Sequence, residues 1–248
     1  LLIEDPEGDD DGPGTYTYPT DGVFTYQGFD IKSFEVSYDA TSLIFTMSLY
    51  GKIGNGWGSK FGFSVQTFDV YIDKDPGSGT GARLLLPGRN ATLVQGNGWD
   101  YAAWVEGWYP QVVVPDPVTL EPVDYTEASS GMKLFVDPGK NAIIARIPIS
   151  FLGGGDPAEW SYAAVLLGQE GYPATGVWRV RDVAQKAEAY KFGGAPADNN
   201  HTRIIDIAWP ADAAQTQAEI LSGYTSSINS ADTLGADDFA VIPLLPIE

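Results

Sequence analysis

Residues 32–49, which read KSFEVSYDATSLIFTMSL, contain two runs in which apolar and polar side chains alternate, one on each side of a turn. The apolar positions are Phe34, Val36 and Tyr38 in the first run and Leu43, Phe45, Met47 and Leu49 in the second. A period of two places the apolar side chains of a strand on one face. Residues 39–42 between the runs favour a tight turn. The stretch therefore predicts an antiparallel β-hairpin with one buried face.

Similar runs recur along most of the chain. We expect further strands at residues 64–72, 83–86, 100–106, 111–114, 132–136, 142–147, 161–167, 203–207 and 239–242, a helix at 211–221, a single helical turn at 149–152 and a long loop at 110–122. The 29 Gly and 17 Pro residues are typical of many short strands joined by turns. The sequence thus predicts an all-β fold: a two-sheet antiparallel β-sandwich of the jelly-roll type with one short C-terminal helix, as a single domain over residues 1–248.

The composition excludes several classes of function. The 33 acidic and 14 basic residues give a formal net charge of −19, which argues against nucleic acids and anionic membranes as partners. No segment is long and apolar enough to span a bilayer. Cysteine is absent and His201 is the single histidine, which excludes thiolate chemistry and a zinc site with several imidazole ligands. His201 lies in the polar run DNNHT at 198–202, which predicts a surface loop and not a catalytic triad.

The opening segment, residues 1–30, contains the acidic run DPEGDDDGPG at positions 5–14, with Asp30 following soon after. Calcium takes about six to eight oxygen ligands from carboxylates and carbonyl groups in flexible geometry. The run therefore favours a calcium-binding loop, and a solvated acidic segment is the alternative. Asp73 and Asp75 begin a second candidate, DKDPGSG at residues 73–79, for which an ordinary turn is the alternative.

Aromatic residues are the candidate ligand-binding groups, because the apolar faces of sugar rings pack well on indole and phenol rings. Trp108, Tyr109, Trp178 and Arg179 lie in segments that resemble loops and are our candidates for a stacking surface. Burial in the core is the alternative for each ring. With so many acidic residues, a pair of carboxylates at a spacing suited to glycoside hydrolysis is expected by chance, and nothing in their spacing supports catalysis.

The run DPEGDDDGPGTYTYPT at residues 5–20 resembles the start of the glucodextranase C-terminal domain family, which also occurs at the ends of amylopullulanases. The resemblance continues through FDI (29–31), WG (57–58), GFSVQ (62–66), DVYID (69–73), PGRNA (87–91), WDYA (99–102) and QAEILSGY (217–224). It implies a DOMON-like β-sandwich related to carbohydrate-binding modules of the family-nine type. It also implies calcium in the fold, with Asp5, Asp9, Asp10 and Asp30 as ligands, and no catalytic activity in this chain.

Two functions follow from these observations. The first is a non-catalytic, extracellular, calcium-stabilised carbohydrate-binding module for α-glucan, a related polysaccharide or a cell-surface glycan. The alternative is a structural or self-assembling protein of the cell surface, of a surface-layer or filament-like type, also stabilised by calcium. Attachment to a larger enzyme or surface protein is compatible with both. Sequons at Asn90 and Asn200 agree with export and predict glycosylation at these positions.

Overall fold

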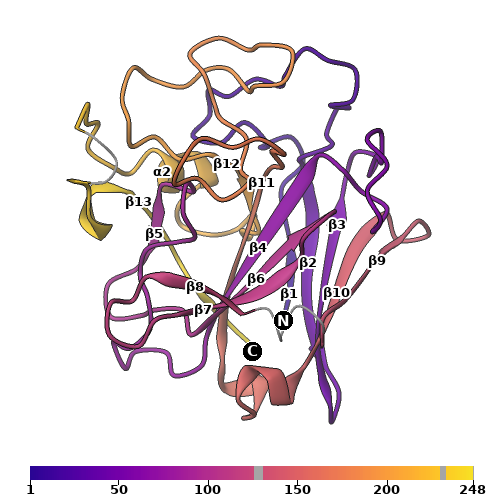
Figure 1. Cartoon of the computed structure of the whole chain (residues 1–248), viewed down its shortest axis with the longest axis vertical. Coiled ribbons are helices and arrows are strands. Elements are labelled where there is room, and N and C mark those ends of the chain that lie inside the picture. Colours follow the sequence, from indigo (N-terminus) through magenta and orange to yellow (C-terminus); the bar gives the residue numbers. More distant parts are fainter. Residues whose placement is uncertain (126–130, 230–232, 248) are drawn as a thin grey trace.

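The computed structural model describes residues 1–125, 131–229 and 233–247, and its strands form two antiparallel sheets packed as a sandwich (Figure 1). The smaller sheet has the spatial order β1 (Leu2–Glu4), β2 (Ile31–Tyr38), β3 (Ser42–Leu49), β10 (Ala142–Pro148) and β9 (Lys133–Asp137). The larger sheet has the order β12 (Ile204–Ile207), β11 (Ser161–Gly168), β4 (Gln66–Asp73), β6 (Tyr101–Glu106), β7 (Gln111–Pro115) and β8 (Pro122–Tyr125), with β14 (Leu245–Pro246) also paired to β11. The predicted two-sheet β-sandwich is confirmed.

The hairpin predicted from residues 32–49 is formed by β2 and β3. Phe34 lies opposite Met47 and Val36 opposite Phe45, so the apolar positions of both runs share one face. The turn is fixed by the carboxylate of Asp39, which accepts hydrogen bonds from the backbone N–H groups of Thr41 at 2.8 Å and Ser42 at 3.0 Å. Such local side-chain acceptors are the reason that aspartate favours turns.

The larger sheet is covered on both faces. Every residue of β4 and β11 is buried. Alternate side chains of β4, such as Phe68 and Val70, pack into the core between the sheets. Tyr71 points to the opposite face and belongs to a second core together with Trp99 and Leu221. The second core is closed by the short helix α2 (Gln217–Leu221) and by the parallel pair β5 (Ala91–Leu93) and β13 (Ala240–Ile242).

Several boundaries differ from the sequence prediction. Residues 83–86 do not form a strand, and Leu84 makes one isolated bridge, opposite Thr92. The stretch 110–122 is not one loop, because β7 and β8 pair antiparallel across its ends. The helix begins at residue 217 and not at 211, because Thr216 caps it: its hydroxyl accepts from the N–H of Glu219 and the Glu219 carboxylate accepts from the N–H of Thr216.

Single helical turns in the described residues include η1 (Ile149–Leu152), as predicted, η2 (Pro157–Glu159) and η4 (Ala236–Asp238). The polar run at 198–202 is not the surface loop that we predicted, since Asn200 is fully buried and His201 is 8% exposed. His201 Nδ1 lies 2.9 Å from the Asp198 carboxylate and Nε2 lies 3.2 Å from the Val183 carbonyl oxygen, so the ring links two loops. Within the described ranges, no helix has the length and apolar character that crossing a bilayer requires.

Candidate functional site

Three aspartates from distant parts of the chain meet at one place, here called the acidic centre. Asp5 follows β1, Asp9 lies in the turns after it, and Asp206 lies in the middle of β12. One carboxylate oxygen from each lies within 4.8 Å of the others. The opening segment is held against β12 by the hydrogen bond from the Gly12 N–H to the Ile205 carbonyl oxygen at 2.9 Å.

Several carboxylate oxygens of the acidic centre are buried and lack a hydrogen-bond donor: Oδ2 of Asp5, Oδ1 of Asp9, Oδ1 of Asp206 and Oδ1 of the neighbouring Asp30. Their second oxygens are partly satisfied, since Asp5 Oδ1 accepts from the Trp209 N–H and Asp206 Oδ2 from the Ile31 N–H, each at 2.6 Å. A buried acceptor without a donor costs about 1–3 kcal/mol, and more when it is charged. No donor or cation among the described residues therefore balances these four carboxylate oxygens.

The pKa values of these carboxyl groups are raised, which agrees with the lack of donors and cations around them. Burial, with repulsion from Asp9 and Asp30, raises the pKa of Asp5 to about 9 despite the opposing backbone hydrogen bond. Burial raises the pKa of Asp9 to about 6, and burial with repulsion from Asp10 raises that of Asp30 to about 7. The pKa of Asp206 also lies well above its ordinary value, mainly through burial and the nearby Asp5. No ion pair in the described part of the chain involves these carboxylates.

The predicted ligands Asp10 and Asp30 border the acidic centre. Asp30 is fully buried, and its Oδ2 accepts from the Gly8 N–H at 2.9 Å. Asp10 accepts a hydrogen bond from the Tyr18 hydroxyl. The sequence prediction missed Asp206, although the sequence contained a signal for it. Asp206 lies between two isoleucines in the strand Ile204–Ile207, in which every residue is buried, and a carboxylate is unusual in such a place. Carboxylates without donors are the oxygen ligands that calcium takes in proteins, so this residue set fits a calcium ion.

The second predicted pair, Asp73 and Asp75, also gains a third carboxylate. Asp100 lies with them so that one oxygen of each is within 4.8 Å of the others. Here the buried Asp73 accepts from the backbone N–H groups of Asp75 and Gly98, at 3.1 and 3.4 Å. No orphaned carboxylate oxygen was found at this triad in the described residues, which distinguishes it from the acidic centre.

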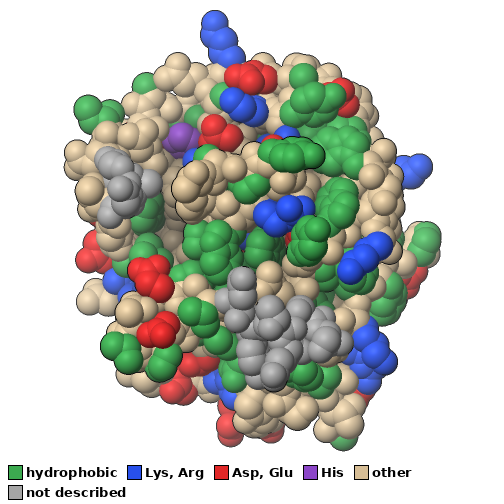
Figure 2. Space-filling model, in the orientation of Figure 1, with side chains coloured by type: hydrophobic (Ala, Val, Ile, Leu, Met, Phe, Trp, Pro, Cys, Tyr) green, Lys and Arg blue, Asp and Glu red, His purple; other side chains and the backbone are tan. Residues whose placement is uncertain are grey.

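A cleft of about 650 Å³ opens among the loops above the larger sheet, and we call it the aromatic cleft. Its walls carry four aromatic rings: Trp57, Trp108, Tyr172 and Tyr190. Trp57 and Tyr190 are 40% and 49% exposed and their ring centroids are 6.4 Å apart. Figure 1 draws the early loops in indigo and the late loops in orange at one end of the molecule, and Figure 2 shows hydrophobic, basic and acidic side chains mixed over that end.

Polar groups of the aromatic cleft form a network without net charge. Arg181 pairs with Glu170 at 2.9 Å, and Arg179 pairs with the buried Glu106 at 3.1 Å. Glu106 also accepts from the side-chain amide of Gln169 at 3.1 Å. Among the polar atoms of the cleft residues, Gln169 Oε1 and Arg181 Nε are buried without a partner. The network fixes rigid planar groups beside the exposed rings, and this is how small polar ligands are oriented in proteins.

The structure brings together three of the four predicted stacking residues. Trp108 and Arg179 line the aromatic cleft, and Tyr109, 64% exposed, lies beside them with its ring centroid 5.0 Å from the Arg179 guanidinium carbon. Trp178 is separate, because it stacks on the buried Trp104 at 5.7 Å and packs against the second core. Trp57 and Tyr190 were not among the candidates. The glycine-rich loop around Trp57 was a signal that its ring is not in a strand.

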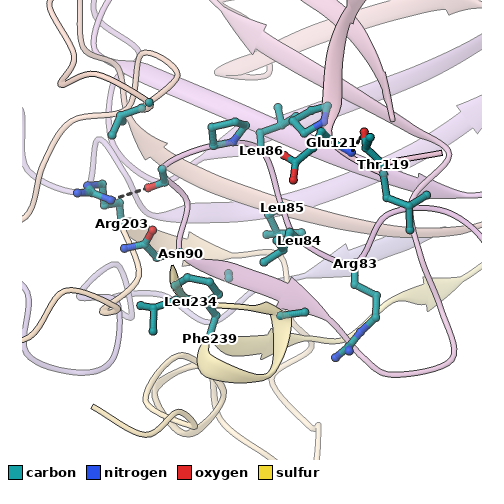
Figure 3. Close-up of a pocket in the computed structure, with 18 of the residues that line it drawn as sticks. Arg83, Leu84, Leu85, Leu86, Asn90, Thr119, Glu121, Arg203, Leu234 and Phe239 are labelled. Atoms are coloured by element: carbon teal, nitrogen blue, oxygen red, sulfur yellow. Dashed lines mark hydrogen bonds between the residues drawn. The ribbon is translucent and has the colours of Figure 1, made fainter. Parts of the chain in front are cut away.

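A larger hollow, of about 810 Å³, lies between the β5–β13 pair and the loops near β8 (Figure 3). Its floor is mainly aliphatic, from Leu84 to Leu86, and Phe239 supplies its aromatic ring. Arg83 and Arg203 lie at its edge, and the latter donates to the Gly88 carbonyl oxygen at 2.9 Å. The described residues that line it include no paired rings of the kind that line the aromatic cleft.

Both predicted glycosylation sites donate hydrogen bonds through their side-chain amides. Asn90 donates to the carbonyl oxygens of Asn199 and His201, at 3.3 and 2.9 Å. Asn200 is fully buried and donates to Thr225 and Asp238 carbonyl oxygens at 2.8 and 2.6 Å. The fold therefore argues against a glycan at Asn200, because the modified side chain would have to leave the interior. Glycosylation of Asn90 stays a prediction.

Comparison with known proteins gives one family. A family model described as the C-terminal binding module, SLH-like, of glucodextranase matches residues 1–235. No curated protein matches the chain.

Proposed function

The chain belongs to the family of C-terminal, SLH-like binding modules of glucodextranase, and on this premise we propose that it binds carbohydrate without catalysing a reaction. We further propose that the ligand is an α-glucan or a related neutral polysaccharide, that it binds in the aromatic cleft, and that the protein acts outside the cell. The predicted polymer class agrees with the enzyme whose module gives the family its name.

The pairing of exposed rings with a charge-neutral network is the observation that supports this proposal. Trp57 and Tyr190 offer apolar faces for sugar rings, while Gln169 and Arg181 supply buried acceptor and donor atoms beside them. Because each arginine of the aromatic cleft is paired with a glutamate, the cleft has no excess positive charge that would favour an anionic ligand. The net charge of −19 adds long-range repulsion against polyanions.

Calcium at the acidic centre is the second part of the proposal. Asp5, Asp9 and Asp206 would hold the ion directly, and Asp30 and Asp10 border it. When bound, calcium would supply the positive charge that the buried oxygens lack and would fasten the opening segment to β12. Ligation at Asp73 and Asp75 stays a prediction. A calcium titration followed by calorimetry tests both sets, since Asp206→Asn and Asp100→Asn remove one carboxylate charge from each.

Binding is tested by calorimetric titration with maltooligosaccharides and α-1,6-linked oligosaccharides. Tyr172 lines the aromatic cleft and is 96% exposed, so Tyr172→Ala removes a ring with little effect on folding. Tyr26, 82% exposed and outside the lining, provides the matched control. We expect Tyr172→Ala to weaken binding by roughly 1 kcal/mol, about fivefold, and Tyr26→Ala to leave it unchanged. Equal effects of the two changes would refute the location, and the absence of binding would refute the function.

The alternative function, assembly at a cell surface, has support from two observations. The family description includes likeness to SLH modules, and the edge strand β9 exposes 48% of Phe135. Exposed sheet edges are templates for pairing with another chain. Light scattering of the protein at rising concentration, with and without calcium, distinguishes the two functions. Large species that form only with calcium would favour assembly, and a monomer that binds α-glucan would favour the carbohydrate-binding module.

A further inference from the structure

A continuous set of aromatic contacts connects the acidic centre with the aromatic cleft. It begins at Tyr18, whose hydroxyl donates to the Asp10 carboxylate and also accepts from the Phe29 N–H at 2.9 Å. The Tyr18 ring lies 5.8 Å from Phe192, and Phe192 lies 6.2 Å from Phe24. Each step joins segments that are far apart in sequence, so the contacts link loops and not neighbours along one strand.

The last step of this set of contacts reaches the cleft wall. Phe24 meets the exposed Trp57 edge to face at 5.9 Å between centroids. The guanidinium of Arg181 lies 5.2 Å from the Phe24 ring and 5.3 Å from the Trp57 ring, so it fixes both. Arg181 also donates to the Tyr190 carbonyl oxygen at 2.5 Å. The positions of Trp57 and Tyr190 in the cleft wall thus depend on the series of side-chain contacts that begins at Tyr18.

Backbone pairing follows the same course. The segment that carries Tyr18 and Phe24 is hydrogen-bonded to the loop that carries Tyr190 and Phe192: Thr20 N–H donates to the Glu188 carbonyl oxygen at 2.9 Å. Residues 17 and 193 exchange two hydrogen bonds, at 3.0 and 2.9 Å. A displacement of the opening segment therefore moves one wall of the cleft with it, because packed interiors shift as units.

We propose that Tyr18 is a positioning residue that couples the two sites, so that calcium bound at the acidic centre strengthens saccharide binding in the aromatic cleft. The inference rests on the proposed function, since it takes the cleft as the saccharide site and the carboxylates as the calcium site. Without the ion, no positive charge balances the buried carboxylates, and the opening segment is held to β12 only by hydrogen bonds such as that from the Gly12 N–H to the Ile205 carbonyl oxygen. With the ion, Asp10 is held in place and its hydrogen bond orients Tyr18 and the rings beyond it.

Reciprocity gives the coupling a strict test, because two linked equilibria must change each other by the same factor. The dissociation constant for maltoheptaose is measured by calorimetry with calcium present and after chelation, and that for calcium with and without maltoheptaose. We expect both to improve by the same factor, about fivefold or more. Tyr18→Phe keeps the ring and removes the hydrogen bond to Asp10, so both ratios should fall to about one while each ligand still binds.

Tyr16→Phe is the matched control. Tyr16 is a buried tyrosine in the same segment whose hydroxyl donates to the Thr202 carbonyl oxygen at 2.6 Å, away from the rings that lead to the cleft. It should lose stability and keep the coupling. If Tyr18→Phe does not fold, Phe24→Leu interrupts the same contacts further along and should uncouple the sites equally. Maltoheptaose binding that ignores calcium in the wild type overturns the inference alone, whereas no α-glucan binding in either state overturns the proposed function as well.

Discussion

Chelating calcium and then raising the pH from about 6 to about 8 is expected to destabilise the protein, because the acidic centre must then hold several negative charges. The pKa of Asp30 is raised by burial from an ordinary 3.8 to about 7, and that of Asp5 to about 9. The folded chain therefore binds protons that the unfolded chain has released. For such raised acids, stability is complete below the unfolded pKa and is lost as pH rises through the folded pKa.

The magnitude is worked from Asp30, a buried group whose raised pKa lies within the pH range of the experiment. For Asp30, the change from 3.8 to about 7 corresponds to at most about 4 kcal/mol over the whole titration, at about 1.36 kcal/mol for each pKa unit. About 1.4 kcal/mol of this is lost between pH 6 and pH 8, because most of the loss occurs at lower pH, where only the unfolded chain has released its proton. Because the acidic centre is shared, the contributions of Asp5 and Asp9 overlap with this one and do not add to it. For a chain of this size, about 1.4 kcal/mol corresponds to a fall in Tm of about 4 °C.

The assay is thermal unfolding in chelator across this pH range, repeated with excess calcium. With calcium the slope should vanish, because the ion replaces the protons and binds only deprotonated carboxylates. Asp30→Asn should reduce the slope of the chelated protein, and the slope due to Asp5 should remain. Asp116→Asn, at an exposed turn carboxylate, should not change it. A chelated protein that keeps the same Tm, or gains stability, as pH rises would show that the carboxylates are not held as the structure indicates.

Three further changes test the fold itself, each by urea unfolding. Arg89→Met should cost about 3–5 kcal/mol, because it leaves the fully buried Asp69 charge without its partner at 2.6 Å, whereas exchanging both residues for apolar ones should cost less. Phe68→Ala should cost about 3–5 kcal/mol through the cavity it leaves between the sheets, and a cost below about 1 kcal/mol would mean that the two sheets do not pack there. Thr216→Ala should cost about 1 kcal/mol by removing the acceptor for the Glu219 N–H, and no loss would contradict the cap.

The hairpin and the sandwich were predictable because their signals are local. The alternation of apolar and polar residues around Phe34 and Phe45 predicts two strands and the buried face of each. The pattern is easy to recognise because its residues lie in one short stretch of the chain, on the two sides of a single turn. The start of the helix was harder to predict from the sequence. Its true boundary depends on the reciprocal hydrogen bonds of Thr216 and Glu219, a capping box that the apolar pattern alone does not locate.

The candidate site was predictable only in part, because it is assembled from contacts between distant segments. Asp5 and Asp9 stand in a conspicuous acidic run, whereas Asp206 joins them only through the packing of β12 against the opening segment. The aromatic cleft shows the same limit. Trp57 and Tyr190 meet across more than a hundred residues, and nothing in the spacing of either ring indicates the other. Trp178 lies in a similar loop-like sequence context, but its ring stacks on the buried Trp104.

The hydrogen bond between Asp5 and Trp209 joins positions 204 residues apart, and this has a consequence for the order in which the chain folds. A chain made from its N-terminus presents Asp5 long before Asp206 exists, so the acidic centre can close only after β12 has been made and has joined the larger sheet. Contacts that close such long loops are formed late and contribute little to the folding barrier. Calcium bound there would then slow unfolding and leave the folding rate almost unchanged, because it would stabilise the folded state and not the transition state.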